Sequence, residues 1–219
     1  MPSPYPELQG ALGSFLDRVD RDLKQSGYTG EPVVMYLAGG LAVNYHCGSR
    51  YTGDIGASFS RRVLLPDAEL VFTYPKRDGA EGVLYFDRNY NSTLALLHPD
   101  HEKGSREWEG LGNERRAIQL HVLSPLDLAV SKVARFSDQD REDIRSLAQV
   151  PGFSFAELQR RADEALGYFV GNQAPIRTSL ALIERDLQSI QPSQDISYRG
   201  PRGSLWFKTS GRSFRHERA

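Results

Sequence analysis

The sequence predicts an α+β protein, in which a small mixed sheet comes first and a helical part follows. Residues 33–37 form a short, almost wholly apolar run, which is typical of a strand buried on both faces, and further strand-like segments follow it. After residue 124 the pattern changes to apolar residues at helical spacing. Strands early and helices late in the chain favour the α+β class.

The first part of the chain reads as one helix followed by strands. Apolar residues recur at helical spacing over residues 8–23, and two glycines then end the segment. The strand at 33–37 runs into Gly39 and Gly40, and residues 41–45 begin a helix. Further strands are predicted over residues 54–59, 69–73, 83–87 and 117–123, with a mostly irregular segment at 89–113.

The second part reads as helices with clear starting signals. Ser124 is a predicted N-cap, with Pro125 at the first helical position and Asp127 three residues after the cap. Later helices are predicted over 138–147, 154–166 (with a capping box at Ser154 and Glu157) and 173–190. We therefore divide the chain into a core (1–123), a helical part (124–191) and a basic tail (192–219).

The tail is predicted to be disordered, because its few apolar side chains cannot offset the entropy of ordering. The alternative is a segment whose arginine and aromatic side chains dock on a partner or on nucleic acid.

Composition narrows the class of protein. The 219 residues carry a formal net charge of -1, which does not favour a general nucleic-acid binder. A single cysteine, Cys47, excludes an internal disulfide, and we expect it to be a buried thiol. No apolar run approaches the ~20 residues that a membrane-spanning helix requires. These features predict a soluble, cytoplasmic protein.

The Gly39-Gly40 turn is the first candidate site. A buried strand that ends in two glycines before a helix brings backbone amides and a positive helix end together, and this arrangement can hold a phosphate. Asp54 begins a strand on the face opposite the core, where a carboxylate can bind a metal ion. The plainer interpretations are a tight turn at the glycines and a turn-capping role for Asp54.

These segments together resemble a known family. Gly-Gly at 39–40, followed about a dozen residues later by Thr52-Gly53-Asp54-Ile55-Gly56, resembles the signature of the polymerase-beta-type nucleotidyltransferase superfamily. More narrowly, residues 59–64, 123–132 and 135–144 resemble bacterial nucleotidyltransferase-like proteins related to the abortive-infection toxins of toxin–antitoxin systems. The resemblance extends to about residue 190 and excludes the tail.

The resemblance implies a metal site that this sequence matches incompletely. Active members hold Mg²⁺ and a nucleoside triphosphate on an Asp-x-Asp pair and a third carboxylate. The first aspartate corresponds to Asp54, whereas the second corresponds to Gly56, which has no side-chain ligand. The third is expected on the strand 117–123, at Gln119, which is neutral. His121 as a base, or Asp87 as a further ligand, could compensate.

The resemblance also implies the nucleotide-binding residues: Gly39, Gly40 and Thr52 at the turn, and Lys132 and Arg135 on the later helix. Asp140 and Asp143 match a charged motif that pins the next helix. The alternative for Lys132 and Arg135 is a solvated charged face with pairs inside the helix.

Three hypotheses remain open. A catalytically impaired homologue would bind a nucleotide or a partner, such as an antitoxin-like protein, without turnover. An active Mg²⁺-dependent enzyme would transfer a nucleoside monophosphate to an RNA or protein acceptor. In a third hypothesis, the protein is purely structural and has retained the fold only for assembly with other molecules. His98 and His101 are interpreted as part of a surface turn, since no third ligand accompanies them.

Overall fold

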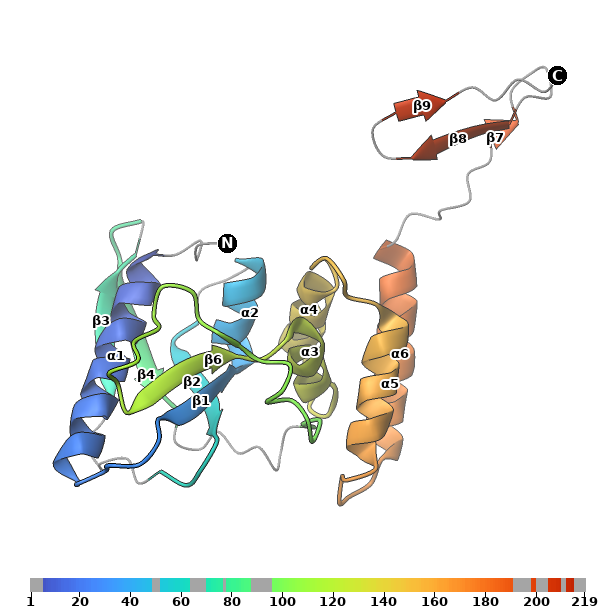
Figure 1. Ribbon diagram of the computed structural model, residues 1–219. Coiled ribbons are helices and arrows are strands. Elements are labelled where there is room, and N and C mark those ends of the chain that lie inside the picture. Colours follow the sequence, from blue (N-terminus) through green and yellow to red (C-terminus); the bar gives the residue numbers. More distant parts are fainter. Residues whose placement is uncertain are drawn as a thin grey trace.

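The structure is a computed structural model that describes residues 6–48, 52–63, 70–76, 78–87 and 96–190, with the backbone of 198–199, 205–209 and 212–214. Six helices are described: α1 (Pro6–Gln25), α2 (Gly39–Cys47), α3 (Pro125–Val133), α4 (Asp138–Leu147), α5 (Phe155–Leu166) and α6 (Ala174–Ile190). The strands of the main sheet are β1 (Val33–Ala38), β2 (Asp54–Phe59), β3 (Val71–Pro75), β4 (Glu81–Phe86), β5 (Arg106–Glu107) and β6 (Ile118–Val122). The predicted α+β class is confirmed (Figure 1).

The main sheet is mixed, with strand order β3-β4-β2-β1-β6-β5. β1 pairs with β2 in antiparallel register, with Ala38 opposite Gly56, and with β6 in parallel register. β2 pairs with β4 in parallel register, with Asp54 opposite Tyr85. β2 therefore lies between β1 and β4, and β6 is two strands away from it.

The two faces of the sheet differ, and the difference follows the period of two along each strand. On β4, Gly82 and Leu84 are buried, whereas Val83 and Tyr85 are exposed. We call the face that carries Val83 and Tyr85 the open face. Because Asp54 pairs with Tyr85, Asp54 belongs to the open face.

α1 and α2 cover the other face of the sheet. Phe15 of α1 is fully buried and its ring contacts Phe72 of β3 and Phe86 of β4. Burying a side chain of this size contributes about 2–3 kcal/mol. α2 packs on β1 and β2, and its Leu41, Ala42 and Val43 are fully buried.

The helical part follows β6 and begins with α3, which packs against α2, α4 and α5 (Figure 1). The Ser124 hydroxyl accepts a hydrogen bond from the Asp127 amide, as the predicted N-cap requires. Ser154 caps α5 in the same way through the Glu157 amide. The reciprocal capping box is instead found at α4, between Ser137 and Asp140.

Several predicted boundaries shift. α2 begins at Gly39 rather than Leu41, so both glycines belong to its first turn. The strand predicted over 69–73 is Val71–Pro75, and the irregular segment contains the two-residue strand β5. Most of the predicted disordered tail lies outside the described residues. Its described pieces, β7 (Tyr198–Arg199), β8 (Leu205–Thr209) and β9 (Arg212–Phe214), pair as an antiparallel sheet.

Among the helices in the described ranges, none combines the length and the apolar character needed to cross a membrane.

Candidate functional site

The turn before α2 has the properties of an anion-binding site. Gly39 has a φ of 65°, in the left-handed region that favours glycine, and a Cβ added there would meet no atom within 4 Å. Ala38 is the N-cap and gives no side-chain hydrogen bond to the helix, and the first turn contains no acidic residue. The first turn of α2 therefore has a positive helix end with no side-chain cap, although Gly40 itself is buried.

Asp54 lies beside this turn. Because Ala38 is opposite Gly56 in an antiparallel pair, Asp54 is level with the residues that start α2. Its side chain is half-buried, and the Thr52 hydroxyl donates a hydrogen bond of 2.5 Å to Asp54 Oδ1. Thr52 thus fixes the carboxylate through Oδ1, and among the described residues no hydrogen bond to the second oxygen is found. Of the predicted residues, Gly39, Gly40, Thr52 and Asp54 are brought together.

Gly56 is buried next to Asp54 and offers no side-chain ligand, but Asp87 lies beside it. The amide of Asp87 donates to the carbonyl of Ile55, which continues the β2–β4 register by one residue beyond β4. Phe86 points to α1, so the alternation along the strand turns Asp87 to the open face. Adjacent strands are about 4.8 Å apart, so Asp87 is at the level of the missing ligand.

Gln119 and His121 do not join this group. Both lie on β6, separated from β2 by β1. Gln119 pairs with Val34, four residues before Ala38, which is roughly 13 Å along the strand. His121 pairs with Tyr36, and two strand spacings put it roughly 10 Å from β2. Gln119 is therefore not at the level of Asp54, and β4 is the neighbour of β2 on the side away from β1 and β6.

His121 belongs to a separate polar cluster on β1 and β6. Its ring contacts that of Tyr36, and its Nδ1 is 3.2 Å from the Ser105 hydroxyl. The Tyr36 hydroxyl donates to Glu102, so the segment around Glu102 covers this half of the open face. Burial lowers the pKa of His121, with the charge of Glu107 opposing it, and the ring is neutral at pH 7.

Arg135 follows α3 and is an exposed cation whose charge interacts with that of Asp54. Its guanidinium group donates two hydrogen bonds of 2.7 Å to Asp140, yet its side chain is 73% exposed. The hydrogen bonds to Asp140 raise the pKa of Arg135, and the charges of Asp140, Asp54 and Asp143 contribute to the same rise. Arg135 is thus within electrostatic reach of Asp54 and open to solvent.

Lys132 is not presented to solvent. Its side chain is 4% exposed, and its Nζ lies 2.7 Å from Asp143 Oδ2 and 3.3 Å from Asp140 Oδ1. Burial acts to raise the pKa of Asp140, but hydrogen bonds from Arg135 and Ser137 and the charge of Lys132 hold it well below its usual range. The alternative of a solvated lysine is wrong, since Lys132 and Asp143 join α3 to α4 inside the protein.

A family model described as a nucleotidyltransferase of unknown function (DUF6036) matches residues 15–185. The chain belongs to this family. No curated protein matches the sequence. The match covers the whole main sheet and all of α3, α4 and α5. The glycine turn, Asp54, and Lys132 with Asp140 and Asp143 therefore all belong to the matched region.

In this member of the family, the side chains beside Gly56 would fit one divalent ion better than two. Within the described ranges, no three His, Cys, Asp or Glu side chains gather so as to hold a metal ion. Asp54 and Asp87 supply two negative charges, which offset one Mg²⁺. Magnesium is commonly bound through one or two carboxylates, with substrate phosphates and water completing the shell.

Two features of this site are difficult to predict from the sequence. The position of Asp87 depends on β4 pairing parallel to β2, which no local pattern encodes. The burial of Lys132 had a weak signal: Asp140 and Asp143 are three residues apart, which places both carboxylates on one face of α4.

His98, interpreted from the sequence as part of a surface turn, has a structural role. His98 is 5% exposed, accepts a hydrogen bond from the Asp100 amide on Nδ1, and lies 2.7 Å from Glu164 through Nε2. Since Nδ1 accepts, Nε2 carries the proton and donates to Glu164 of α5. His98 therefore fastens the turn at 98–104 to the helical part.

Proposed function

We propose that this protein binds a nucleoside triphosphate together with one Mg²⁺ and is impaired as a transferase. The triphosphate would lie against the amides that follow Gly39 and Gly40, and Arg135 would approach it from the helical part. Asp54 and Asp87 would hold the ion, which in such sites neutralises phosphate charge and polarises the phosphoryl group.

The observation that carries the proposal is the combination of an uncapped glycine turn at the start of α2 with Asp54 beside it and no side-chain ligand at Gly56. The turn and Asp54 are sufficient for binding a metal–phosphate complex. Catalysis of phosphoryl transfer by two ions requires the ligands that bridge them, and the loss of one such group costs about 10- to 100-fold.

The alternative is an active Mg²⁺-dependent nucleotidyltransferase with an RNA or protein acceptor. The register of Asp87 beside Gly56 favours it, since a carboxylate from β4 could take over part of the missing ligand's role. In either case we propose a toxin–antitoxin-like setting with an antitoxin-like partner, for which the only support is the sequence resemblance described above.

Binding and transfer are measured separately. Titration of a fluorescent ATP analogue should give saturable binding with Mg²⁺ and binding at least tenfold weaker in EDTA. Asp54→Asn and Asp87→Asn should each weaken the Mg²⁺-dependent binding by about tenfold or more. Glu81→Gln is the matched control, because Glu81 is an exposed acid at the other end of β4 and should bind as wild type does.

Transfer is followed with labelled nucleoside triphosphates, Mg²⁺ and total RNA or cell lysate as acceptor. We expect no transfer by the wild type and a gain in Gly56→Asp. Transfer by the wild type that Asp54→Asn abolishes would replace the impaired form of the proposal by the alternative. Absence of any Mg²⁺-dependent nucleotide binding would refute both.

A further inference from the structure

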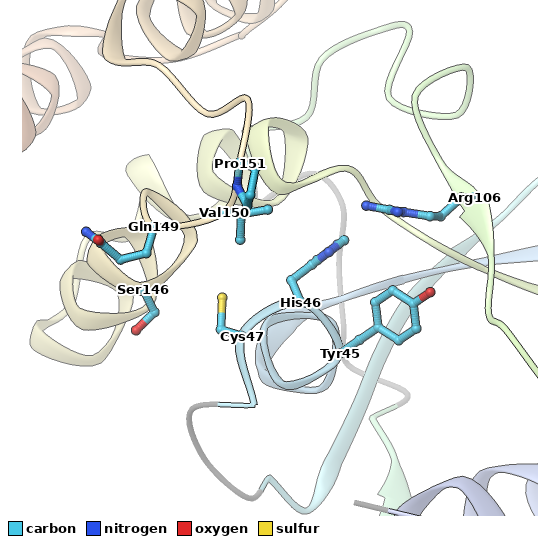
Figure 2. A pocket seen from close by; sticks show the side chains of 8 residues that line it. All are labelled: Tyr45, His46, Cys47, Arg106, Ser146, Gln149, Val150 and Pro151. Carbon is cyan, nitrogen blue, oxygen red and sulfur yellow. The ribbon is translucent and has the colours of Figure 1, made fainter. Parts of the chain in front are cut away.

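A cavity lies on the side of the sheet that α1 and α2 cover. Its volume is about 540 Å³, and it is lined by the end of α2 (Tyr45, His46 and Cys47), by Arg106 of β5, and by Ser146, Gln149, Val150 and Pro151 at the end of α4 (Figure 2). Cavities of roughly 300–1,000 Å³ suit small organic ligands. α2 has nine residues, so this cavity is about 12 Å from the glycine turn at the other end of the helix.

Arg106 gives the cavity its charge. Figure 2 shows its guanidinium group extending toward the space beside His46. Arg106 is exposed, and among the described residues no carboxylate pairs with it. Its neighbour Glu107 lies on the opposite face of β5, paired in register with His121. The guanidinium group therefore keeps its hydrogen-bond donors for a ligand.

Among the described residues that line the cavity none is acidic, so none of them offsets the charge of Arg106. Burial lowers the pKa of His46, opposed by its contact with the Leu123 carbonyl, and the charge of Arg106 lowers it further. His46 is thus neutral at pH 7 and adds no charge. Asp143, whose charge acts on Cys47, is paired with Lys132 at 2.7 Å and is not part of the lining. The lining as a whole is singly positive and selects for an anion.

The remaining walls suit an apolar or aromatic group. The Tyr45 ring packs on the buried Trp108 with a centroid distance of 4.6 Å, which fixes its orientation. Val150 and Pro151 form the opposite wall beside Ser146 and Gln149 (Figure 2). Burial raises the pKa of the Cys47 thiol to about 11, with a contribution from Asp143, so this cysteine is a poor nucleophile near pH 7.

We propose that this cavity is a binding site for a small organic anion, in which Arg106 holds a phosphate or carboxylate group and Tyr45, Val150 and Pro151 contact an aromatic or aliphatic body. A planar guanidinium group suits such anions because it can donate two parallel hydrogen bonds to them. The site is separate from the glycine turn and does not depend on the function proposed for it.

Cys47 provides a readout confined to this cavity, because it is the only cysteine of the chain. Alkylation by iodoacetamide at pH 9, followed by intact mass, reports its accessibility. Phenyl phosphate and benzoate should slow the alkylation with half-effects at roughly millimolar concentration, as expected for ligands of this size. Benzyl alcohol and benzylamine, which lack the anionic group, should give at most a fifth of that effect at the same concentration.

Arg106→Gln should weaken the protection by about tenfold or more, since hydrogen bonds to charged groups are the strong contacts of such a site. Arg115→Gln is the matched control, because Arg115 is exposed and outside the lining. Asp54→Asn should keep full protection, which separates this cavity from the nucleotide site. The unliganded alkylation rate and the melting temperature of each variant establish that it is folded.

Three results would overturn the proposal: no protection by either anion at 20 mM, equal protection by benzyl alcohol, or protection that survives in Arg106→Gln. A preference for phenyl phosphate over benzoate would identify a phosphate ester as the ligand class, and the reverse preference would identify a carboxylate.

Discussion

Replacement of Lys132 by methionine is expected to lower the free energy of unfolding by about 3–5 kcal/mol, the usual cost of removing one partner of a buried ion pair. The reason is the position of Lys132 between Asp140 and Asp143, whose side chains are 1% and 2% exposed. Asp140 keeps its hydrogen bonds from Arg135 and Ser137 in this variant. Asp143 loses the ammonium group at 2.7 Å, so most of the cost arises there.

The assay is urea unfolding followed by circular dichroism and by tryptophan fluorescence. For a chain of this length, a loss of 3–5 kcal/mol corresponds to a melting temperature lower by about 6–20 °C. Arg135→Ala is the comparison variant: its side chain is 73% exposed, so it should cost about 1 kcal/mol or less. A double variant, Lys132→Met with Asp143→Leu, should recover part of the loss, because both charges are then removed.

A Lys132→Met variant that keeps its stability within about 1 kcal/mol of the wild type would contradict the structural role of Lys132. If that variant also lost nucleotide binding, Lys132 would be a phosphate ligand that leaves the cluster when the nucleotide binds. The double variant distinguishes these cases, since only the structural role predicts recovery.

Three further expectations follow from the described contacts. Gly39→Ala should lower the free energy of unfolding by about 1–2 kcal/mol, because the φ of 65° at this position is unfavourable for alanine. Gly10→Ala, in the interior of α1 with no atom near the added Cβ, should raise it by about 0.5–1 kcal/mol in the same urea assay. The folded pKa of Asp140 is lowered, so its contribution to stability is complete above its unfolded pKa of about 4 and is lost as the pH falls through the folded value. The unfolding free energy of Asp140→Asn should therefore decline less steeply than that of the wild type between pH 5 and 2.5. Equal slopes for the two proteins would contradict the lowered pKa of Asp140. Arg161→Ala should destabilise the protein by about 2–3 kcal/mol, because it removes the cation paired with Asp127, whose side chain is 1% exposed. Arg160→Ala removes only exposed ion pairs and should match the wild type in thermal unfolding.

The local elements could be predicted from the sequence because their signals are local. The strand 54–59 and the helix 138–147 have the predicted bounds, and Ser124 caps α3 through the predicted amide. Alternation of small and apolar residues along β2 was sufficient to assign Asp54 to the face opposite the core. A proline and a serine at the start of α3 encode that boundary within four residues.

Strand neighbours and burial could not be predicted in the same way. Whether β4 or β6 lies beside β2 depends on pairing between segments far apart in the chain, so the sequence alone could not place Asp87, rather than Gln119, beside Gly56. The burial of Lys132 depends on the packing of α4 against α3. Helical spacing alone cannot distinguish a solvated lysine from one enclosed by two aspartates. The catalytic state of position 56 remains a prediction that the transfer assay tests.

The position of α2 determines where the chain can be truncated. One end of the helix forms the glycine turn, its flank packs against α3 and α4, and its Leu41, Ala42 and Val43 are fully buried. A polypeptide ending at residue 123 would expose that flank to water, and we expect such a fragment to aggregate rather than to keep the glycine turn in place. The sheet and the first helices of the second part should therefore melt in one cooperative transition, and the binding surface should be lost in the same step.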